Sequence, residues 1–120
     1  MLLIRAIVRP EKSSAVLKAL INVGFPGVTK MPVAGRGKQR GLKVGDITYD
    51  ELPKELLLIA IKDADKDFVV NTIIEAARTG TKGAFGDGKI FITPVIESYT
   101  ISSGIKEVSA SQLAETKNIG

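Results

Sequence analysis

The run Leu56-Leu57-Leu58-Ile59-Ala60-Ile61 (LLLIAI) is an uninterrupted aliphatic stretch in the middle of the chain. A continuous apolar run of this length is typical of a buried strand at the centre of a sheet, where neither face meets water. We therefore expect residues 56–61 to form a central strand, and the flanking sequence to supply its neighbours.

Three further strands are predicted around this run. Residues 2–8 are aliphatic and β-branched, and Pro10, which lacks the N–H that a central ladder needs, ends the strand. Residues 28–34 alternate in polarity and contain Pro32, which favours an edge strand or a bulge. Residues 89–96 are β-branched and predict the last strand.

Two helices are predicted between these strands. Apolar residues recur with helical spacing over residues 11–23, where Pro10 suits the first turn and Gly24 the C-terminal stop. A second helix is expected after Asp63 or Asp65, either of which can cap it. Its apolar face comprises Phe68, Val69, Thr72, Ile73, Ala76 and Ala77.

The resulting order, β-α-β-loop-β-α-β, predicts an α+β fold of the ferredoxin-like βαββαβ type. A four-stranded antiparallel sheet then carries two helices on one face, and its bare face has to be covered. We expect a single domain over residues 1–104. Residues 105–120 are small and polar, so we expect a flexible or loosely docked tail.

Composition excludes several classes of function. The 120 residues include no cysteine and no histidine, which rules out disulfides, thiolate metal sites, Ser-His and Cys-His catalysis and histidine-bound metals. No nucleophile stands beside a base, so we do not expect an enzyme. No apolar run reaches the roughly 20 residues that span a bilayer. The lack of cysteine fits a cytoplasmic protein.

One long glycine-rich segment is basic. Residues 35–50 read GRGKQRGLKVGDITYD, without a sustained helix or strand period, which predicts a long mobile loop. Its cations, with a chain net charge of +4, are compatible with a merely solvated loop or with RNA binding. The aromatic residues do not form the paired stacking motif of RNA-binding ferredoxin-like sheets, so we expect no nucleic-acid partner.

A second glycine-rich segment, GAFGDGK at residues 83–89, matches the first seven positions of a phosphate-binding P-loop. It connects a helix to a strand and has Ile90 in place of the metal-binding hydroxyl, so a P-loop ATPase is excluded. Backbone N–H groups near Gly86 and Gly88, together with Lys89, are nevertheless suited to phosphate oxygens. The alternative is an ordinary tight turn with a solvated lysine.

Five segments, taken in order, resemble the PII family of nitrogen regulatory signalling proteins over residues 1–104. They are IRAIVRP (4–10), GRGKQRG (35–41), LPK (52–54), RTG (78–80) and GDGKIF (86–91). The resemblance implies a trimer, either of identical chains or with a paralogue, whose sheets pack around a central axis. It also implies a signalling loop at 36–53 and a nucleotide loop at 79–89.

The resemblance further implies a site for ATP or ADP between neighbouring subunits. Ile7, Gly27, Val28 and Thr29 would lie near the adenine, and Gly35, Gly37, Lys38 and Gln39 on one side of the nucleotide. Gly86, Asp87, Gly88 and Lys89 would hold the phosphates. Gln39, Gly41 and Lys54 would bind 2-oxoglutarate, together with a Mg²⁺ ion that Gln39 coordinates.

YDELPK (49–54) and PVIESYT (94–100) look like the branch of this family that regulates nitrogenase, which makes nitrogenase the first expected partner. An ammonium transporter or another metabolic enzyme is the alternative. The chain departs from the family pattern in three places. The signalling loop is shorter and has no tyrosine or serine at the usual modification site; residues 81–84 form an insertion containing Lys82; and Thr100 and Ser102 replace two arginines expected near the phosphates.

Overall fold

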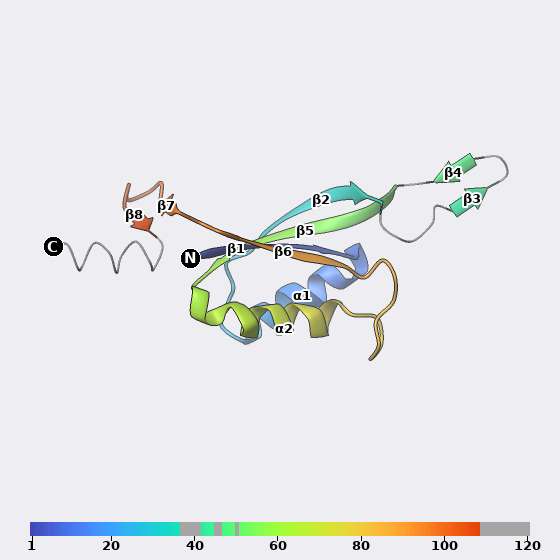
Figure 1. Ribbon diagram of the computed structural model, residues 1–120, viewed down its shortest axis with the longest axis horizontal. Helices are drawn as coiled ribbons and strands as arrows, with labels where there is room; N and C mark the ends of the chain where they lie inside the picture. The colour runs from blue at the N-terminus through green and yellow to red at the C-terminus, as the bar shows by residue number, and fades with distance from the viewer. Residues whose placement is uncertain (37–41, 45–46, 50, 109–120) are drawn as a thin grey trace.

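A four-stranded antiparallel sheet with two helices on one face forms the body of the chain (Figure 1). The computed structural model describes residues 1–36, 42–44, 47–49 and 51–108. The elements of the body are β1 (Leu2–Val8), α1 (Pro10–Asn22), β2 (Thr29–Gly35), β5 (Leu52–Ile61), the 3-10 turn η1 (Asp63–Asp65), α2 (Lys66–Ala77) and β6 (Gly88–Pro94). Two short ribbons are added to it, β3 (Leu42–Val44) with β4 (Ile47–Tyr49), and β7 (Glu97–Tyr99) with β8 (Lys106–Val108).

The strand order β2-β5-β1-β6 confirms the ferredoxin-like prediction. β5, which contains the run 56–61, pairs with β1 on one side and β2 on the other. β2 is an edge strand, as Pro32 had indicated, because an edge position tolerates a residue without an N–H. β6 forms the opposite edge and pairs with β1 alone.

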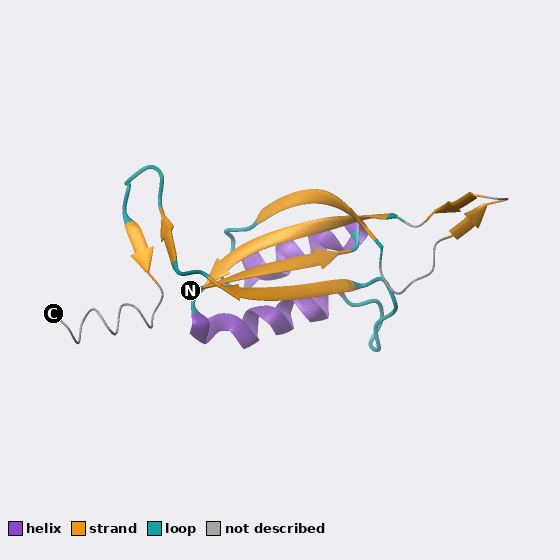
Figure 2. Cartoon of the chain, turned by 45° about the horizontal axis from the view of Figure 1, so that its top comes forward, coloured by secondary structure: helices purple, strands orange, loops and turns teal. Residues whose placement is uncertain are grey.

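The core lies between the sheet and the two helices, which Figure 2 shows together on one side of the strands. Every second residue of β1 and β5 faces this core, since side chains alternate along a strand. The buried apolar set is Ile4, Ala6, Val8, Val16, Leu20, Leu57, Ile59, Ile61, Val69, Ile73 and Ala77. Burying such side chains supplies most of the driving force for folding.

The helix ends follow the sequence signals in α1 but not in α2. α1 begins at Pro10, and Gly24, with a φ of 94°, reverses the chain after its last turn. The aspartates expected to cap α2 do not do so: they form η1, and Asp65, at the N-cap position, makes no side-chain hydrogen bond. Asp63 Oδ1 instead accepts a hydrogen bond at 2.7 Å from the amino group of Met1.

The predicted apolar face of α2 is only partly buried. Val69, Ile73 and Ala77 lie in the core, whereas Phe68 is 54% exposed and packs against Phe25, with ring centroids 6.3 Å apart. The buried residues recur every fourth position, so the stripe facing the sheet is narrower than the apolar sequence pattern.

Several boundaries differ from the sequence prediction. β5 begins at Leu52 because residues 52–55 continue the ladder with the end of β2, up to the pair Gly35 and Leu52. β6 ends at Pro94, and β7 follows it. The segment 35–50, predicted to lack strands, contains β3 and β4, and residues 106–108 of the predicted tail pair with β7.

The face of the sheet that the helices leave uncovered is largely apolar. The register places Leu3, Arg5 and Ile7 of β1 on this open face, because their neighbours Ile4, Ala6 and Val8 face the core. By the same register, Met31, Leu56, Leu58, Lys89 and Phe91 share it. Within the described residues, no helix combines the length and apolarity needed to cross a bilayer.

Candidate functional site

The loop that connects α2 to β6, residues 79–87, is held together by the carboxylate of Asp87. Oδ2 accepts hydrogen bonds from the backbone N–H groups of Thr79, at 3.0 Å, and Ala84, at 2.8 Å. Oδ1 accepts one from the Thr79 hydroxyl, at 2.6 Å, and one from Arg9 Nε, at 3.0 Å. Asp87 therefore ties the beginning, the middle and the end of this connecting loop to one another.

These hydrogen bonds also fix the ionisation of Asp87. Partial burial alone would raise the pKa of the carboxyl group, but the bonds from Thr79, Ala84 and Arg9 outweigh it and hold that pKa far below the usual range. Asp87 is consequently a carboxylate at any physiological pH, and both of its oxygens already accept hydrogen bonds from the protein.

Two cationic side chains from outside the loop also contact it. Arg9, at the end of β1, donates from Nη2 to the carbonyl oxygen of Phe85 at 2.7 Å, besides its bond to Asp87. Lys54, near the start of β5, donates a hydrogen bond to the carbonyl oxygen of Gly86. Burial lowers the pKa of the Lys54 ammonium and the charge of Arg9 lowers it further, while Glu11 and Asp87 act in the opposite direction.

Glycine is required where the loop joins β6. Gly86 and Gly88 have φ values of 90° and 122°, which other residues rarely adopt. A Cβ atom on Gly88 would lie 1.8 Å from the carbonyl oxygen of Ile7 on the neighbouring strand. The backbones of β1 and β6 therefore approach each other closely only because residue 88 has no side chain.

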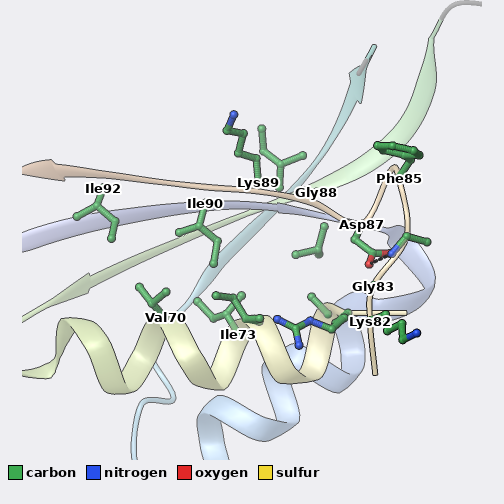
Figure 3. Close-up of a pocket in the computed structure, with 16 residues that line it drawn as sticks. Val70, Ile73, Lys82, Gly83, Phe85, Asp87, Gly88, Lys89, Ile90 and Ile92 are labelled. Atoms are coloured by element: carbon green, nitrogen blue, oxygen red, sulfur yellow. Dashed lines mark hydrogen bonds between the residues drawn. The ribbon is translucent and has the colours of Figure 1, made fainter. Parts of the chain in front are cut away.

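The connecting loop and the start of β6 offer groups that can bind an anion. The N–H groups of Phe85 and Gly86 donate no hydrogen bond within the described part of the chain. Lys89 is paired with Ile7, and its side chain points to the opposite side of β6 from Ile90 and Ile92 (Figure 3). Free backbone N–H groups together with a lysine ammonium are the chemistry that phosphate oxygens require.

A pocket of about 920 Å³ lies on the helix side of this loop (Figure 3). Its walls come from Val70, Ile73 and Ile74 of α2 and from Ile90 and Ile92 of β6, so it is mainly apolar. Arg78 and Lys82 line its end at the connecting loop, as do Asp87 and Gly88. The connecting loop thus closes one end of a mainly apolar groove.

The structure brings together one part of the predicted site. Ile7, Asp87, Gly88 and Lys89 meet around the connecting loop, and Lys54 contacts Gly86. Thr29 is paired with Leu58, and Gly27 and Val28 precede it; none of these three lines the pocket beside the loop.

The rest of the predicted site is at the signalling loop. Gly35 ends β2 opposite Leu52, and Gly37, Lys38, Gln39 and Gly41 lie outside the described residues. Gln39, the predicted Mg²⁺ ligand, is among them. Within the described part, no three His, Cys, Asp or Glu side chains gather in a way that would hold a metal ion.

Sequence reasoning missed two residues of this arrangement, Arg9 and Thr79. Both stand in quoted motifs, IRAIVRP and RTG, but nothing in either motif indicates that they share Asp87 as a partner. The sequence assigned Asp87 to phosphate binding, and in the structure its carboxylate accepts the four hydrogen bonds described above.

The model of the family "Nitrogen regulatory protein P-II" matches residues 1–104. The chain belongs to this family. It is 55% identical over 104 residues to "Nitrogen fixation nifHD region GlnB-like protein 1" of Methanothermococcus thermolithotrophicus, covering 87% of this chain and 96% of that protein. A protein of Methanosarcina barkeri, "Nitrogen fixation nifHD1 region GlnB-like protein 1", is 50% identical with the same coverage. "Nitrogen regulatory protein P-II 2" of Methanothermobacter thermautotrophicus is 44% identical over 103 residues, 82% of this chain and 87% of that protein.

Proposed function

We propose that this P-II family member senses ATP or ADP together with 2-oxoglutarate, and controls nitrogenase through its signalling loop. The observation that carries the proposal is the meeting of Lys54, from the base of the signalling loop, with Gly86 of the connecting loop. The names of the relatives, which refer to nitrogen fixation regions, support nitrogenase as the target.

The nucleotide phosphates would bind at the cationic end of the open face. Lys89 and the N–H groups beside Gly86 and Gly88 supply donors for phosphate oxygens, and Ile7 supplies an apolar surface for the base. Asp87 would hold the loop and would not contact phosphate, because its oxygens already accept four hydrogen bonds. Thr29 with Gly27 and Val28, and Gly35 with residues 37–39, would complete the site.

A trimer explains how these separate groups form one site. Thr29 lies on the edge strand β2 and Lys89 on the opposite edge strand β6 of the same sheet. Packing the open faces of three chains around an axis would bring one chain's β2 edge toward the next chain's β6 edge. The apolar open face supports such packing, since a large exposed apolar surface marks an interaction site.

2-Oxoglutarate would bind next to the nucleotide through Lys54, Gln39 and Gly41, with Mg²⁺ held by Gln39 and the ligands. A lysine ammonium suits a carboxylate, and an amide oxygen suits Mg²⁺. The dicarboxylate would then compete with the Gly86 carbonyl for Lys54. A ligand that binds one loop conformation better than another shifts the loop toward it, which would alter docking on nitrogenase.

Calorimetric titration tests the sensor. ATP should bind to the full chain, and 2-oxoglutarate should bind only when Mg²⁺ and ATP are present. Lys89→Ala should weaken ATP binding at unchanged thermal stability, and Lys54→Met should abolish 2-oxoglutarate binding. Absence of both binding events in the wild-type protein would overturn the proposal.

The target is tested separately by co-purification with nitrogenase. The wild-type chain should retain a nitrogenase component, and 2-oxoglutarate with Mg²⁺ and ATP should release it. A chain that binds both effectors but never nitrogenase would keep the sensor and exclude this target.

A further inference from the structure

Arg9 makes two hydrogen bonds to the connecting loop, and the described part of the chain shows one such bond from Lys54. Its guanidinium donates to Asp87 Oδ1 at 3.0 Å and to the carbonyl oxygen of Phe85 at 2.7 Å. The side chain is 23% exposed and Asp87 is 20% exposed, so water competes only weakly for this ion pair. Glu11, at 3.9 Å, is the other acidic side chain near it.

One of these two hydrogen bonds is made to the peptide group that carries a free N–H donor of the loop, that of Gly86. The carbonyl of Phe85 belongs to the peptide group that carries the N–H of Gly86, so a hydrogen bond to the carbonyl fixes the orientation of that N–H. Asp87, on the other side of Gly86, is held by the same guanidinium. Gly86 has a φ of 90°, and as a glycine it would otherwise exchange among many conformations.

We propose that Arg9 is the positioning residue of the nucleotide loop. It acts through Phe85 and Asp87, contacts no phosphate, and sets the affinity for nucleotide by presenting the Gly86 N–H in one orientation. The proposal rests on the proposed function for its ligand. Preorganisation lowers the cost of binding, because the loop does not have to be ordered when the anion arrives.

Geometry, not charge, is the property that the loop requires of Arg9. An arginine fork can bond a carboxylate and a carbonyl at the same time, whereas a lysine is a single point charge on a flexible stem. Arg9→Lys retains the cation but should lose the simultaneous bonds. Lys18→Ala is the matched control, since it removes one positive charge from the exposed surface of α1.

The test combines two measurements on the full chain and on the variants Arg9→Ala, Arg9→Lys and Lys18→Ala. Amide hydrogen exchange without ligand should show the N–H groups of Thr79, Ala84 and Asp87 exchanging at least about tenfold faster in both Arg9 variants. Calorimetry should show the Kd for ATP rising about tenfold in both, and unchanged in Lys18→Ala.

Each outcome decides a different point. ATP affinity equal to wild type in Arg9→Ala, or fully restored in Arg9→Lys, overturns the positioning role. If Arg9→Ala does not fold, Arg9→Lys alone decides. If the wild-type chain binds no ATP, the proposed function fails, while the exchange rates still establish whether Arg9 holds the loop.

Discussion

Gly88 shows how a single missing side chain determines the site. Replacing it with alanine would put a Cβ atom 1.8 Å from the carbonyl oxygen of Ile7 and impose an unfavourable φ of 122°. We expect Gly88→Ala to lower the free energy of unfolding by about 3 kcal/mol, because β1 and β6 must separate. Chemical denaturation measures this. Gly27→Ala, with open space around it and no positive φ, is the control and should change stability little.

The ionisation of Asp87 should make the free energy of unfolding depend on pH. Its folded pKa lies below the unfolded value of about 4, so its contribution is complete above that value and is lost as the pH falls through the folded pKa. We expect Asp87→Asn to be less stable at pH 7, and to lose less stability than wild type between about pH 5 and pH 3. Denaturant titrations at a series of pH values measure both effects. Parallel curves for the two proteins would contradict this role of Asp87.

The sequence predicted the turn at residues 86–88 but not the hydrogen bonds of the Asp87 carboxylate. Gly86-Asp87-Gly88 could be predicted as a turn, because glycine and aspartate have strong local preferences. The function of the Asp87 carboxylate could not, because Arg9 is 78 positions away in the chain. A local pattern carries no information about which distant side chain will lie next to it after folding.

At the scale of elements, α2 shows that an apolar residue pattern does not by itself determine which side chains are buried. Ile73 is 1% exposed and Phe68 is 54% exposed, although both belong to the predicted apolar face. We expect Ile73→Ala to cost about 2–4 kcal/mol, because it leaves a cavity in the core between α2 and the sheet. Phe68→Ala should cost no more than about 1 kcal/mol, mainly from its contact with Phe25. Unfolding measured at one protein concentration tests the ranking, and equal losses would contradict it.

The elements themselves could be predicted, but several of their ends could not. The aliphatic run 56–61 and the helical spacing in α1 are properties of local sequence, and both predictions were confirmed. The start of β5 at Leu52 depends on its pairing with β2. The strands β3 and β4 are only three residues long each. Such short strands are stabilised by their partners, not by a pattern of their own.

At the scale of the whole molecule, the open face of the sheet should determine the assembly. Leu58 lies on this face, on β5, between Arg5 of β1 and Thr29 of β2. We expect Leu58→Lys to convert the proposed trimer into a monomer, because it puts a second cation beside Arg5 on a surface that has to lose its water. Light scattering coupled to size exclusion measures the mass against 12.8 kDa per chain.

Ile21→Lys provides the control for this change, because Ile21 is 58% exposed on α1, on the helix side of the sheet. This variant should retain the wild-type mass. Since the two halves of the proposed nucleotide site would lie on opposite edges of one sheet, the Leu58→Lys monomer should also lose most of its ATP binding. A Leu58→Lys variant that keeps the trimer mass would exclude the open face as the interface. A monomer that binds ATP as tightly as wild type would place the whole nucleotide site within one chain.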